Sequence, residues 1–425
     1  MTIRSTAPAN RTPNRRQFLR AAGTAAGLAA TYAAPRVTVL GEEVKGANER
    51  IGVGFIGVGG RCQAHIDIVK KLQEEGKAEP VAVCDVYAPR LEAARQKCGG
   101  VKAYRAHEEL LQDPNVDVVC IASPDRHHAP QAIDAVEAGK DVYCEKPLTH
   151  WSQFELAKKL EEAAAGKRRI VQVGTQYMAD ENYAKVSQMI KDGVIGKVIH
   201  AQLGYFRRGD WGERMVIPDA GAKPGPDLDW ERFLGDAPQV PFSVSRFFQW
   251  RLYWDYAGGP ATDLLVHTFT PVFCLLGLDY PQRVFGGGGC FQYDREVPDQ
   301  CNIIADYKNG PSIVMMNSLS NYTGIDTKIR GTDGIILLTN AGIRIVPIDP
   351  KTGKETDEIV LAWNGMGDTA KLWRNFIECV GSRQQPFSPI SAAVRVQAPL
   401  SAGIIGHREN KVVLFDAEKQ KLTLS

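Results

Sequence analysis

The sequence predicts an α/β protein in two parts, a doubly wound parallel sheet followed by a mainly antiparallel sheet. Two observations predict the first part: from about residue 50, short apolar runs alternate with amphipathic runs, and the apolar runs are continuous. Continuous apolar strands are buried on both faces, as in a parallel sheet covered by crossover helices. A third observation predicts the second part: beyond residue 197, strand-like runs are joined by short turns such as Lys308-Asn309-Gly310.

The first part is expected to form one domain over residues 50–175. Its strands are expected at 51–57, 80–85, 116–123, 141–147 and 170–174, and its helices at 64–76, 89–97, 130–140 and 153–166. Strands that alternate with helices in this way pair in parallel through right-handed crossovers. The alternation therefore predicts a doubly wound domain.

The second part, residues 176–425, is richer in strands. Its strands are expected at 197–206, 282–294, 301–308, 311–320, 327–334, 334–339 and 342–348, and its helices at 369–381 and 391–405. A long irregular stretch between Arg207 and Trp254 holds four of the seven tryptophans. Long loops inside compact domains are usually functional, so we expect this stretch to contribute to a site.

The first 34 residues have the pattern of an export signal. The stretch NRRQFLR at 14–20 resembles the twin-arginine (Tat) signal motif, with Arg15 and Arg16 as the pair, and the apolar run from Ala21 to Ala34 follows it. A disordered basic tail and a mitochondrial transit peptide are the alternatives. We expect a twin-arginine signal peptide at 1–34, a linker at 35–49, and a periplasmic or otherwise exported protein.

The composition argues against several kinds of partner. Six of the 51 basic residues lie within residues 1–41, which contain no acid, so 45 basic residues face 49 acidic ones in the rest of the chain. A mildly acidic body without a basic stripe is not expected to bind nucleic acid. No apolar stretch has the length of a membrane span. The nine cysteines form no CxxC pair, so we expect mostly buried free thiols and no metal site.

A glycine-rich turn follows the first expected strand. The stretch VGFIGVGGRC places Gly57, Gly59, Gly60 and Arg61 between a strand and a helix. Gly57 permits a tight turn, Gly59 lets the backbone approach a pyrophosphate, and the helix N-terminus favours that negative charge. Cys62 replaces the third glycine of G-x-G-x-x-G, and a purely structural turn is the alternative. The pattern predicts a Rossmann domain that binds a dinucleotide.

Asp85 ends the second expected strand and bears on the choice of dinucleotide. Its carboxylate can accept hydrogen bonds from the adenosine ribose hydroxyls and would repel a 2′-phosphate. Asp85 therefore favours NAD over NADP. Arg90 lies close enough in the sequence to leave NADP open.

Three further motifs follow the glycine turn in a specific order. They are SPDRHH at 123–128, EKP at 145–147 and GGPATDLLVH at 258–267. With the glycine turn, they resemble the glucose–fructose oxidoreductase and inositol dehydrogenase family (Gfo/Idh/MocA) over roughly residues 50–405. The resemblance implies an N-terminal Rossmann domain and a C-terminal α/β domain with an open sheet. Because that sheet is often used for oligomerisation, a homo-oligomer is expected.

The resemblance also implies roles for individual residues. Lys146, Asp263 and His267 are the expected catalytic residues. An ammonium can donate to the reacting oxygen, a histidine can act as general base, and Asp263, four residues before His267 on one expected helix, can orient the substrate or the imidazole. A solvated lysine and a structural carboxylate–histidine pair are the alternatives.

Two more groups of residues are expected around the cofactor and the substrate. The further cofactor-binding residues are Ser123, Pro124, His128, Glu145, Lys146 and Gln176. The substrate-binding residues are Arg207, Trp211, Tyr253 and Tyr256, because aromatic faces with nearby donors suit a sugar. Packing within an irregular loop would explain the aromatic residues equally well.

The family and the export signal together imply an enzyme that keeps its cofactor, because little NAD is free outside the cytoplasm. The first expectation is an NAD(P)-dependent oxidoreductase that acts on a sugar or polyol hydroxyl. The second is a glycosidase that cleaves its substrate by transient oxidation and elimination on bound NAD. The third is a non-catalytic sugar-binding sensor, against which the presence of Lys146, Asp263 and His267 argues.

Overall fold

The computed structural model describes residues 50–209 and 216–425. The expected signal peptide, the expected linker and Trp211 lie outside the described residues. Among the helices of the described part, none has the length and apolar character that crossing a bilayer requires.

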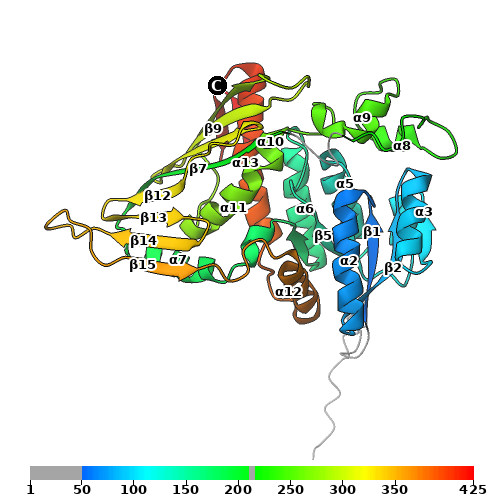
Figure 1. Ribbon diagram of the computed structural model, residues 1–425, viewed down its shortest axis with the longest axis horizontal. Coiled ribbons are helices and arrows are strands. Elements are labelled where there is room, and N and C mark those ends of the chain that lie inside the picture. Colours follow the sequence, from blue (N-terminus) through cyan, green and yellow to red (C-terminus); the bar gives the residue numbers. More distant parts are fainter. Residues whose placement is uncertain (1–49, 210–215) are drawn as a thin grey trace, which may run out of the picture. The chain divides into compact units, whose positions relative to one another are not determined.

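A parallel sheet forms the first part of the described chain (Figure 1). Across this sheet the strands are β3 Lys102–Tyr104, β2 Ala78–Cys84, β1 Ile51–Ile56, β4 Val118–Ile121, β5 Asp141–Cys144 and β6 Val171–Val173. The connecting helices are α2 Gly60–Glu74, α3 Ala88–Lys97, α4 His107–Leu111, α5 Asp125–Glu137 and α6 Phe154–Lys167. The doubly wound fold is confirmed. The strand β3 and the helix α4 were not expected, since β3 has three residues and lies at the sheet edge.

Both faces of this sheet are buried, which explains the continuous apolar strands. In β4, Val118 and Cys120 pack in a core with Ile66 of α2, whereas Val119 and Ile121 pack in another core with helices α5 and α6. Side chains alternate between the two faces of a strand, so a strand covered by helices on both sides needs apolar residues at every position.

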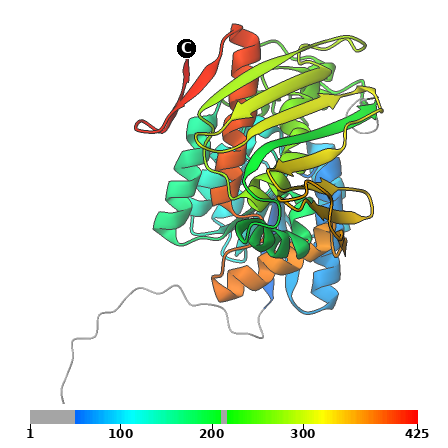
Figure 2. The same ribbon diagram turned by 90° about the vertical axis from the view of Figure 1, so that its left-hand side faces the viewer.

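A larger, mixed sheet forms the second part, and Figure 2 turns it toward the viewer. Across it lie β15 Ile359–Ala362, β14 Gly342–Pro347, β13 Gly334–Leu338, β12 Thr327–Gly331, β7 Val198–Arg208, β10 Ser312–Ser318, β9 Gln300–Asp306, β8 Arg283–Gly289, β16 Val413–Asp416 and β17 Lys421–Leu424, while β11 Ser320–Asn321 pairs with β7. Among the described strands of this sheet, only β7 and β10 pair in parallel. The expected mainly antiparallel sheet is confirmed, and the short, half-exposed strands β11 and β15 to β17 were not expected.

Helices cover the inner face of the large sheet. They are η1 Gln176–Ala179, α7 Asn182–Lys191, α10 Pro260–Asp263, α11 Leu265–Leu276 and α13 Ile390–Glu409, whereas α12 Thr369–Ser382 packs against the parallel sheet. Phe269 of α11 and Leu400 of α13 share a core with Leu203 of β7 and Ile303 of β9. The sheet and these helices together place the α10–α11 junction beside the carboxyl end of β5, as the contact of Lys146 with Asp263 shows.

The last two helices also complete the core of the parallel sheet. Trp373 and Phe376 of α12 pack with the strands β1 and β4, and Val394 of α13 packs on their other face. Gln172 of β6 donates a hydrogen bond to the Leu372 carbonyl at 2.9 Å. The carboxyl-terminal helices therefore belong to both parts of the structure.

One segment of the second part lies against the first. Residues 219–256, here called the cap segment, contain α8 Trp230–Leu234, α9 Val244–Phe248 and η3 Trp250–Leu252. Figure 1 shows α8 and α9 near α3 and α5. The cap segment has its own aromatic core, and Tyr87, just after β2, is part of that core. Residues 219–254, which belong to the stretch expected to be irregular, thus fold as part of a small unit.

The nine cysteines are free thiols. Cys98 and Cys274 are half-buried, Cys290 is exposed, and the other six are buried. Within residues 50–209 and 216–425, the structure places no group of three His, Cys, Asp or Glu side chains together as metal ligands would be.

Candidate active site

The glycine turn joins β1 to α2 and faces the end of β4. Gly57 has φ 76°, and a Cβ atom there would lie 2.6 Å from the backbone nitrogen of Ser123. Only glycine suits a position that has both constraints. The helix α2 starts at Gly60 without an acid in its first turn, so its free N–H groups can receive a pyrophosphate. Cys62 is fully buried and packs in the core.

Asp85 braces the glycine turn from the end of β2. One carboxylate oxygen accepts a hydrogen bond from the Val58 N–H and the other accepts one from the Tyr87 N–H, each at 2.9 Å. Arg90 lies 3.9 Å from the same carboxylate and over the rings of Phe247 and Phe248 in the cap segment. Asp85 therefore both fixes the turn and lines the space beside it.

A cavity of about 700 Å³ lies over the glycine turn. This volume lies within the usual range of cofactor and ligand pockets. Its lining residues on the sheet side include Gly57, Gly59, Gly60, Arg61, Asp85, Ser123 and Pro124. The cap segment contributes further lining residues, and others, such as Arg90, Arg105 and His107, come from the first part of the chain. The orphan N–H groups of α2 and the acid at the end of β2 fit a dinucleotide in this cavity.

Lys146 follows β5 and joins the two parts of the structure. Its ammonium donates to the Asp263 carboxylate at 2.7 Å and to the Asp263 carbonyl oxygen at 3.0 Å. Both side chains are about nine-tenths buried, with exposed fractions of 10% and 8%. Arg251 of the cap segment lies 3.9 Å from the same carboxylate. The carboxyl ends of parallel strands are where ligands bind in such folds, so Lys146 lies where a reacting group is needed.

His267 lies on a different helix from Asp263. Pro260 begins α10 after Gly259, which has φ 63°, and α10 ends at Asp263; α11 then begins at Leu265. The single helix expected over these residues is thus broken at Leu264. The spacing still brings both side chains to Lys146, whose charge acts on each of them.

His267 is buried and neutral. Burial, and next the positive charge of Lys146, lower the pKa of His267 to about 3. Its Nδ1 atom has no hydrogen-bond partner among the described residues. The rings of Tyr177 and Tyr205 lie 5.6 Å and 6.4 Å from the imidazole. A neutral imidazole with an uncommitted nitrogen can accept a proton from a bound molecule.

Glu145, next to Lys146, is held by a chain of buried groups. One carboxylate oxygen accepts hydrogen bonds from Arg61 Nε at 2.8 Å and from His65 Nε2 at 2.9 Å. Trp373 Nε1 donates to His65 Nδ1 at 2.9 Å. Because an indole nitrogen can only donate, His65 must carry its proton on Nε2 and donate it to Glu145.

The charge of Glu145 is stabilised by this arrangement. Burial alone would raise the pKa of Glu145, but the Arg61 charge, the His65 hydrogen bond and the Lys146 charge hold it well below its usual range. Burial lowers the pKa of His65, so this histidine stays neutral. Sequence reasoning missed His65 and Trp373. His65 is four residues after Arg61 on α2, which was an available signal, whereas Trp373 offered none.

Ser123, Pro124 and His128 surround the start of α5. Ser123 donates to Gln131 at 2.7 Å, and Pro124 precedes the first residue of α5. The His128 ring lies 2.6 Å from the Pro147 carbonyl oxygen and 2.8 Å from that of Ser123. Burial lowers the pKa of His128 to about 4, so the neutral ring donates to one of these carbonyls. His128 therefore links the loops that follow β4 and β5.

Gln176, which was expected at the cofactor, begins η1, and its buried Oε1 has no partner within the described part of the chain. The described residues expected around a substrate fall into two places. Arg207 lies near the end of β7, two residues after Tyr205. Tyr253 shares a 2.7 Å hydrogen bond with Ser245 inside the cap segment, and Tyr256 is fully buried in the aromatic core of that segment.

Two models of one family match the chain in succession. The model described as "Oxidoreductase family, NAD-binding Rossmann fold" matches residues 51–175, and the one described as "Oxidoreductase family, C-terminal alpha/beta domain" matches residues 180–424. The first part of the chain is therefore an NAD-binding Rossmann domain.

Curated relatives include two kinds of protein. The myo-inositol 2-dehydrogenase of Thermotoga maritima is 26% identical over 308 residues, which cover 71% of this chain and 79% of that protein. A glycosyl hydrolase family 109 protein of Shewanella pealeana is 29% identical over 238 residues, which cover 49% of this chain and 49% of that protein.

Solved structures share the fold. The WlbA dehydrogenase of Bordetella pertussis, in complex with NADH and UDP-GlcNAcA, has a TM-score of 0.63 at 18% identity, with 87% of this chain and 99% of that chain covered. A levoglucosan dehydrogenase in complex with NADH has a TM-score of 0.63 at 18% identity, with 88% and 99% covered. Since both family models match in order over nearly all described residues, this chain belongs to the Gfo/Idh/MocA oxidoreductase family.

Proposed function

We propose that this chain oxidises a hydroxyl group of a sugar or polyol with an NAD that stays bound between turnovers. The observation that carries the proposal is the buried Lys146–Asp263 pair, which lies at the carboxyl end of β5 with neutral His267 beside it. Relatives named myo-inositol 2-dehydrogenase and levoglucosan dehydrogenase support a polyol or sugar as the substrate.

The chemistry needs a hydride acceptor, a hydroxyl ligand and a proton acceptor. The nicotinamide, when bound, supplies the hydride acceptor. Lys146 uses two of its N–H bonds on Asp263, and the third can donate to the hydroxyl oxygen of the substrate. Asp263 thereby orients the ammonium. This arrangement requires no metal ligand.

His267 is the proposed proton acceptor. Its lowered pKa keeps the ring unprotonated at neutral pH, and its buried Nδ1 atom has no partner among the described residues, so the ring can take up a proton. The hydroxyl proton becomes strongly acidic as its carbon loses a hydride, so a weakly basic imidazole suffices. Tyr177 and Tyr205, whose rings lie beside the imidazole, are proposed substrate contacts. Gln176 is proposed at the cofactor, and Arg207, Trp211, Tyr253 and Tyr256 are proposed substrate contacts from the sequence alone.

Asp85 favours NAD over NADP. Its carboxylate lines the cavity, where it would repel a 2′-phosphate. Arg90 lies 3.9 Å from Asp85 and partly balances its charge. An Asp85→Ala variant that gains use of NADP relative to NAD would support this choice.

The test begins with the purified protein as it is. After denaturation, the released nucleotide is identified by mass spectrometry, and NAD is expected at close to one per chain. Sugars and polyols are then offered together with a carbonyl acceptor, because a retained cofactor must pass its hydride to a second compound. Lys146→Ala and His267→Ala should abolish turnover while NAD remains bound; absence of NAD in the wild-type protein would contradict the proposal.

A second function is supported by the similarity to the glycosyl hydrolase family 109 protein. In that scheme a sugar hydroxyl is oxidised, the acidified neighbouring C–H is deprotonated, the glycosidic bond is eliminated, water adds, and the hydride returns. No second substrate is consumed. Cleavage of aryl glycosides without added cofactor would select this function, whereas sugar binding without turnover would indicate a non-catalytic sensor.

Export and assembly complete the proposal. The Arg15-Arg16 motif supports transport by the twin-arginine route to the periplasm or beyond it. That route would deliver a folded protein with its cofactor in place. The open face of the large sheet, with Phe285 37% and Ile304 40% exposed, supports a homo-oligomer.

A further inference from the structure

We propose that the cap segment forms the outer wall of the dinucleotide site. We also propose that the ion pair between Arg126 and Asp236, here called the clasp, holds the cap segment in place, so that the cofactor is retained between turnovers. The inference rests on the proposed function, since it concerns the same bound dinucleotide. It assigns a role to residues of the second part of the chain that neither the glycine turn nor the catalytic residues explain.

The wall of the cavity is composed of two kinds of residue. On one side lie the glycine turn, Asp85 and Ser123, which fit a dinucleotide. The opposite wall comes from the cap segment and includes Arg232, Phe233, Phe247, Phe248, Trp250 and Arg251. A dinucleotide seated on the helix α2 N-terminus must therefore lie beneath the cap segment. Aromatic and guanidinium groups also suit the flat faces of an adenine or a nicotinamide.

The cap segment is attached to the residues that follow β2. The Ala88 N–H donates to the Asp227 carbonyl at 2.8 Å, and the Asp229 N–H donates to the Val86 carbonyl at 3.0 Å. Tyr87 lies between these bonds and packs edge-on against Phe247 at 5.6 Å between ring centroids. This attachment starts at Val86, the residue that follows Asp85.

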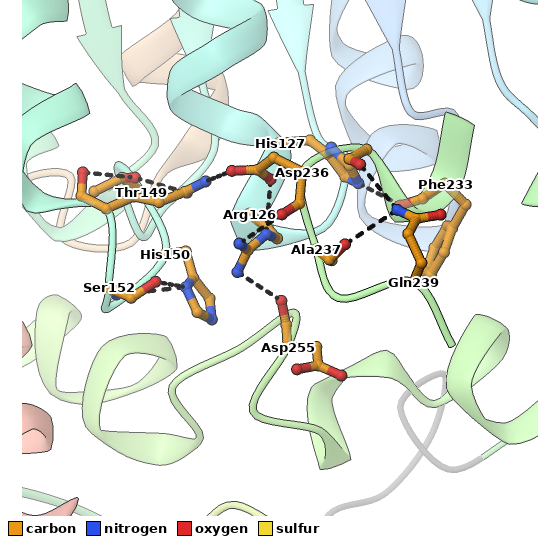
Figure 3. Close-up of polar contacts among 12 residues, drawn as sticks. Arg126, His127, Thr149, His150, Ser152, Phe233, Asp236, Ala237, Gln239 and Asp255 are labelled. Atoms are coloured by element: carbon orange, nitrogen blue, oxygen red, sulfur yellow. Dashed lines mark hydrogen bonds and ion pairs between the residues drawn. The ribbon is translucent and has the colours of Figure 1, made fainter. Parts of the chain in front are cut away.

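The cap segment is also attached to the start of α5, which follows β4 (Figure 3). Arg126 Nε donates to the Asp236 carboxylate at 2.7 Å, its Nη2 donates to the Asp236 carbonyl at 3.1 Å, and its Nη1 donates to the Asp255 carbonyl at 3.2 Å. Gln153 donates to the second carboxylate oxygen of Asp236 at 3.0 Å. The neighbouring His127 ring lies 2.7 Å from the Phe233 carbonyl oxygen.

The order of the strands shows what the two attachments enclose. In the parallel sheet, β1 lies between β2 and β4, and the glycine turn follows β1. The cap segment is fastened after β2 and again after β4, so it spans the glycine turn. Opening of either attachment would therefore widen the path by which a bound dinucleotide leaves. The Arg126 side chain is 13% exposed and the Asp236 side chain is 57% exposed. The guanidinium makes one bond to the Asp236 carboxylate and one to the Asp236 carbonyl, so this clasp is a charge-assisted side-chain attachment.

The backbone attachment near Tyr87 persists in any side-chain variant, whereas the clasp can be removed by one substitution. Arg126→Ala deletes three hydrogen bonds to the cap segment and leaves the glycine turn, Lys146 and His267 untouched. The variant should therefore bind NAD but release it faster. Asp236→Asn is a milder change that keeps an acceptor for Arg126 and removes the charge.

The experiment measures the release of labelled NAD. Wild-type protein, Arg126→Ala and Asp236→Asn are loaded with isotopically labelled NAD⁺, and excess unlabelled NAD⁺ is added; the label that stays with the protein is followed over time. Arg395→Ala is the matched control, because Arg395 forms a comparable ion pair with Glu161 away from the cavity. We expect release to be at least tenfold faster in Arg126→Ala, severalfold faster in Asp236→Asn and unchanged in Arg395→Ala.

The possible outcomes separate the two proposals. Wild-type protein that carries and captures no NAD contradicts the proposed function. Wild-type protein that retains NAD, together with clasp variants that release it within twofold of the wild-type rate, overturns the role of the clasp alone. If Arg126→Ala does not fold, as judged by its thermal unfolding, the release rate of Asp236→Asn is used instead. A rate within twofold of the wild-type rate then overturns the role of the clasp. Wild-type protein that exchanges its NAD within seconds also overturns retention.

Discussion

The Lys146 ammonium lies 2.7 Å from the Asp263 carboxylate, although the two residues are 117 positions apart in the chain. Lys146 follows a strand of the Rossmann domain, and Asp263 ends a helix under the large sheet. The pair is thus formed across the two parts of the structure. A reaction that depends on it depends on their correct association.

The Lys146–Asp263 pair predicts a graded loss of activity. Lys146→Ala removes the only ammonium at the reacting position among the described residues, so turnover should fall by about 10²- to 10⁴-fold, the usual value of acid–base assistance. Asp263→Asn keeps a hydrogen-bond acceptor and should cost less, roughly tenfold to a hundredfold. Steady-state rates at saturating substrate measure both effects.

The matched control for this prediction is Lys167→Ala. Lys167 is 48% exposed and pairs with Glu137 on the surface, where an ion pair contributes little. The turnover rate of Lys167→Ala should equal that of the wild-type protein. Equal rates for Lys146→Ala and wild type would remove Lys146 from the mechanism.

Four buried histidines predict that the protein loses stability in mild acid. His65, His128, His150 and His267 are buried, and burial lowers the pKa of each. The unfolded chain takes up protons on these residues below about pH 6.5, whereas the native state does so only at lower pH. The contribution of these histidines to the free energy of unfolding is therefore complete above about pH 6.5. It is lost as the pH falls toward their pKa values in the native state.

The expected loss follows from this difference in proton binding. Between pH 7.5 and 5.5, His128, His150 and His267, whose pKa values are lowered to about 4, about 3 and about 3, should each reduce the free energy of unfolding by about 1.4 kcal/mol, or by about 4 kcal/mol together. His65 should act in the same direction. Urea unfolding at the two pH values measures the change. In His150→Gln, which can keep a hydrogen bond to the Trp254 carbonyl, the change should be smaller by about one histidine's share. A free energy that does not vary over this range would contradict the assignment of neutral, buried rings.

The hydrogen bond from Trp373 to His65 predicts an effect that passes through Glu145. In Trp373→Phe the ring still stacks on Tyr143, whose centroid lies 4.5 Å away, but the N–H donor is lost. The His65 Nδ1 atom is then left buried without a partner, which should cost about 1–3 kcal/mol in unfolding free energy. The His65 proton is also no longer confined to Nε2, so Glu145 should be held less firmly beside Lys146.

A double-mutant cycle separates this positioning role from simple packing. His65→Leu and Trp373→Phe are made singly and together, and an interaction energy of about 0.5–3 kcal/mol is expected for groups that share a hydrogen bond. Trp373→Phe should also lower kcat while KM stays near the wild-type value. Additive free energies together with unchanged kcat would show that Trp373 only fills space.

The sequence predicted the parallel sheet well because its strands are buried on both faces. Val118 to Ile121 show this most clearly, since each residue enters one of two cores. The strand β3 lacks that signal because Lys102 and Ala103 are exposed at the sheet edge. The strands β16 and β17 are likewise partly exposed, and their pairing with each other and with β8 depends on tertiary contacts.

The candidate site was predictable where residues belong to motifs and unpredictable where only folding brings them together. Lys146, Asp263 and His267 lie in the EKP and GGPATDLLVH motifs and meet in the structure. Trp373 reaches His65 from 308 positions away, and no local pattern marks that contact. The Arg126–Asp236 clasp likewise joins residues 110 positions apart, although Arg126 is part of a motif.

The glycine turn offers a prediction with a matched control. Gly57 and Gly76 have nearly the same positive φ, 76° and 74°. A Cβ atom at Gly57 would lie 2.6 Å from the Ser123 backbone, whereas no atom of the described residues lies within 4 Å of one at Gly76. Both alanine variants should pay the cost of a left-handed backbone, about 1 kcal/mol. Only Gly57→Ala should also displace the loop after β4 and so widen the dinucleotide site.

Thermal unfolding and NAD content measure the two parts of this effect. Gly76→Ala should lower the unfolding temperature slightly and keep its full content of NAD. Gly57→Ala should lose a further 1–3 kcal/mol, the usual cost of overpacking, and should be purified with little or no NAD. Since both variants share the backbone cost, the difference between them isolates the contact with Ser123. If Gly57→Ala keeps a full complement of NAD, the close approach of the turn to β4 does not shape the site.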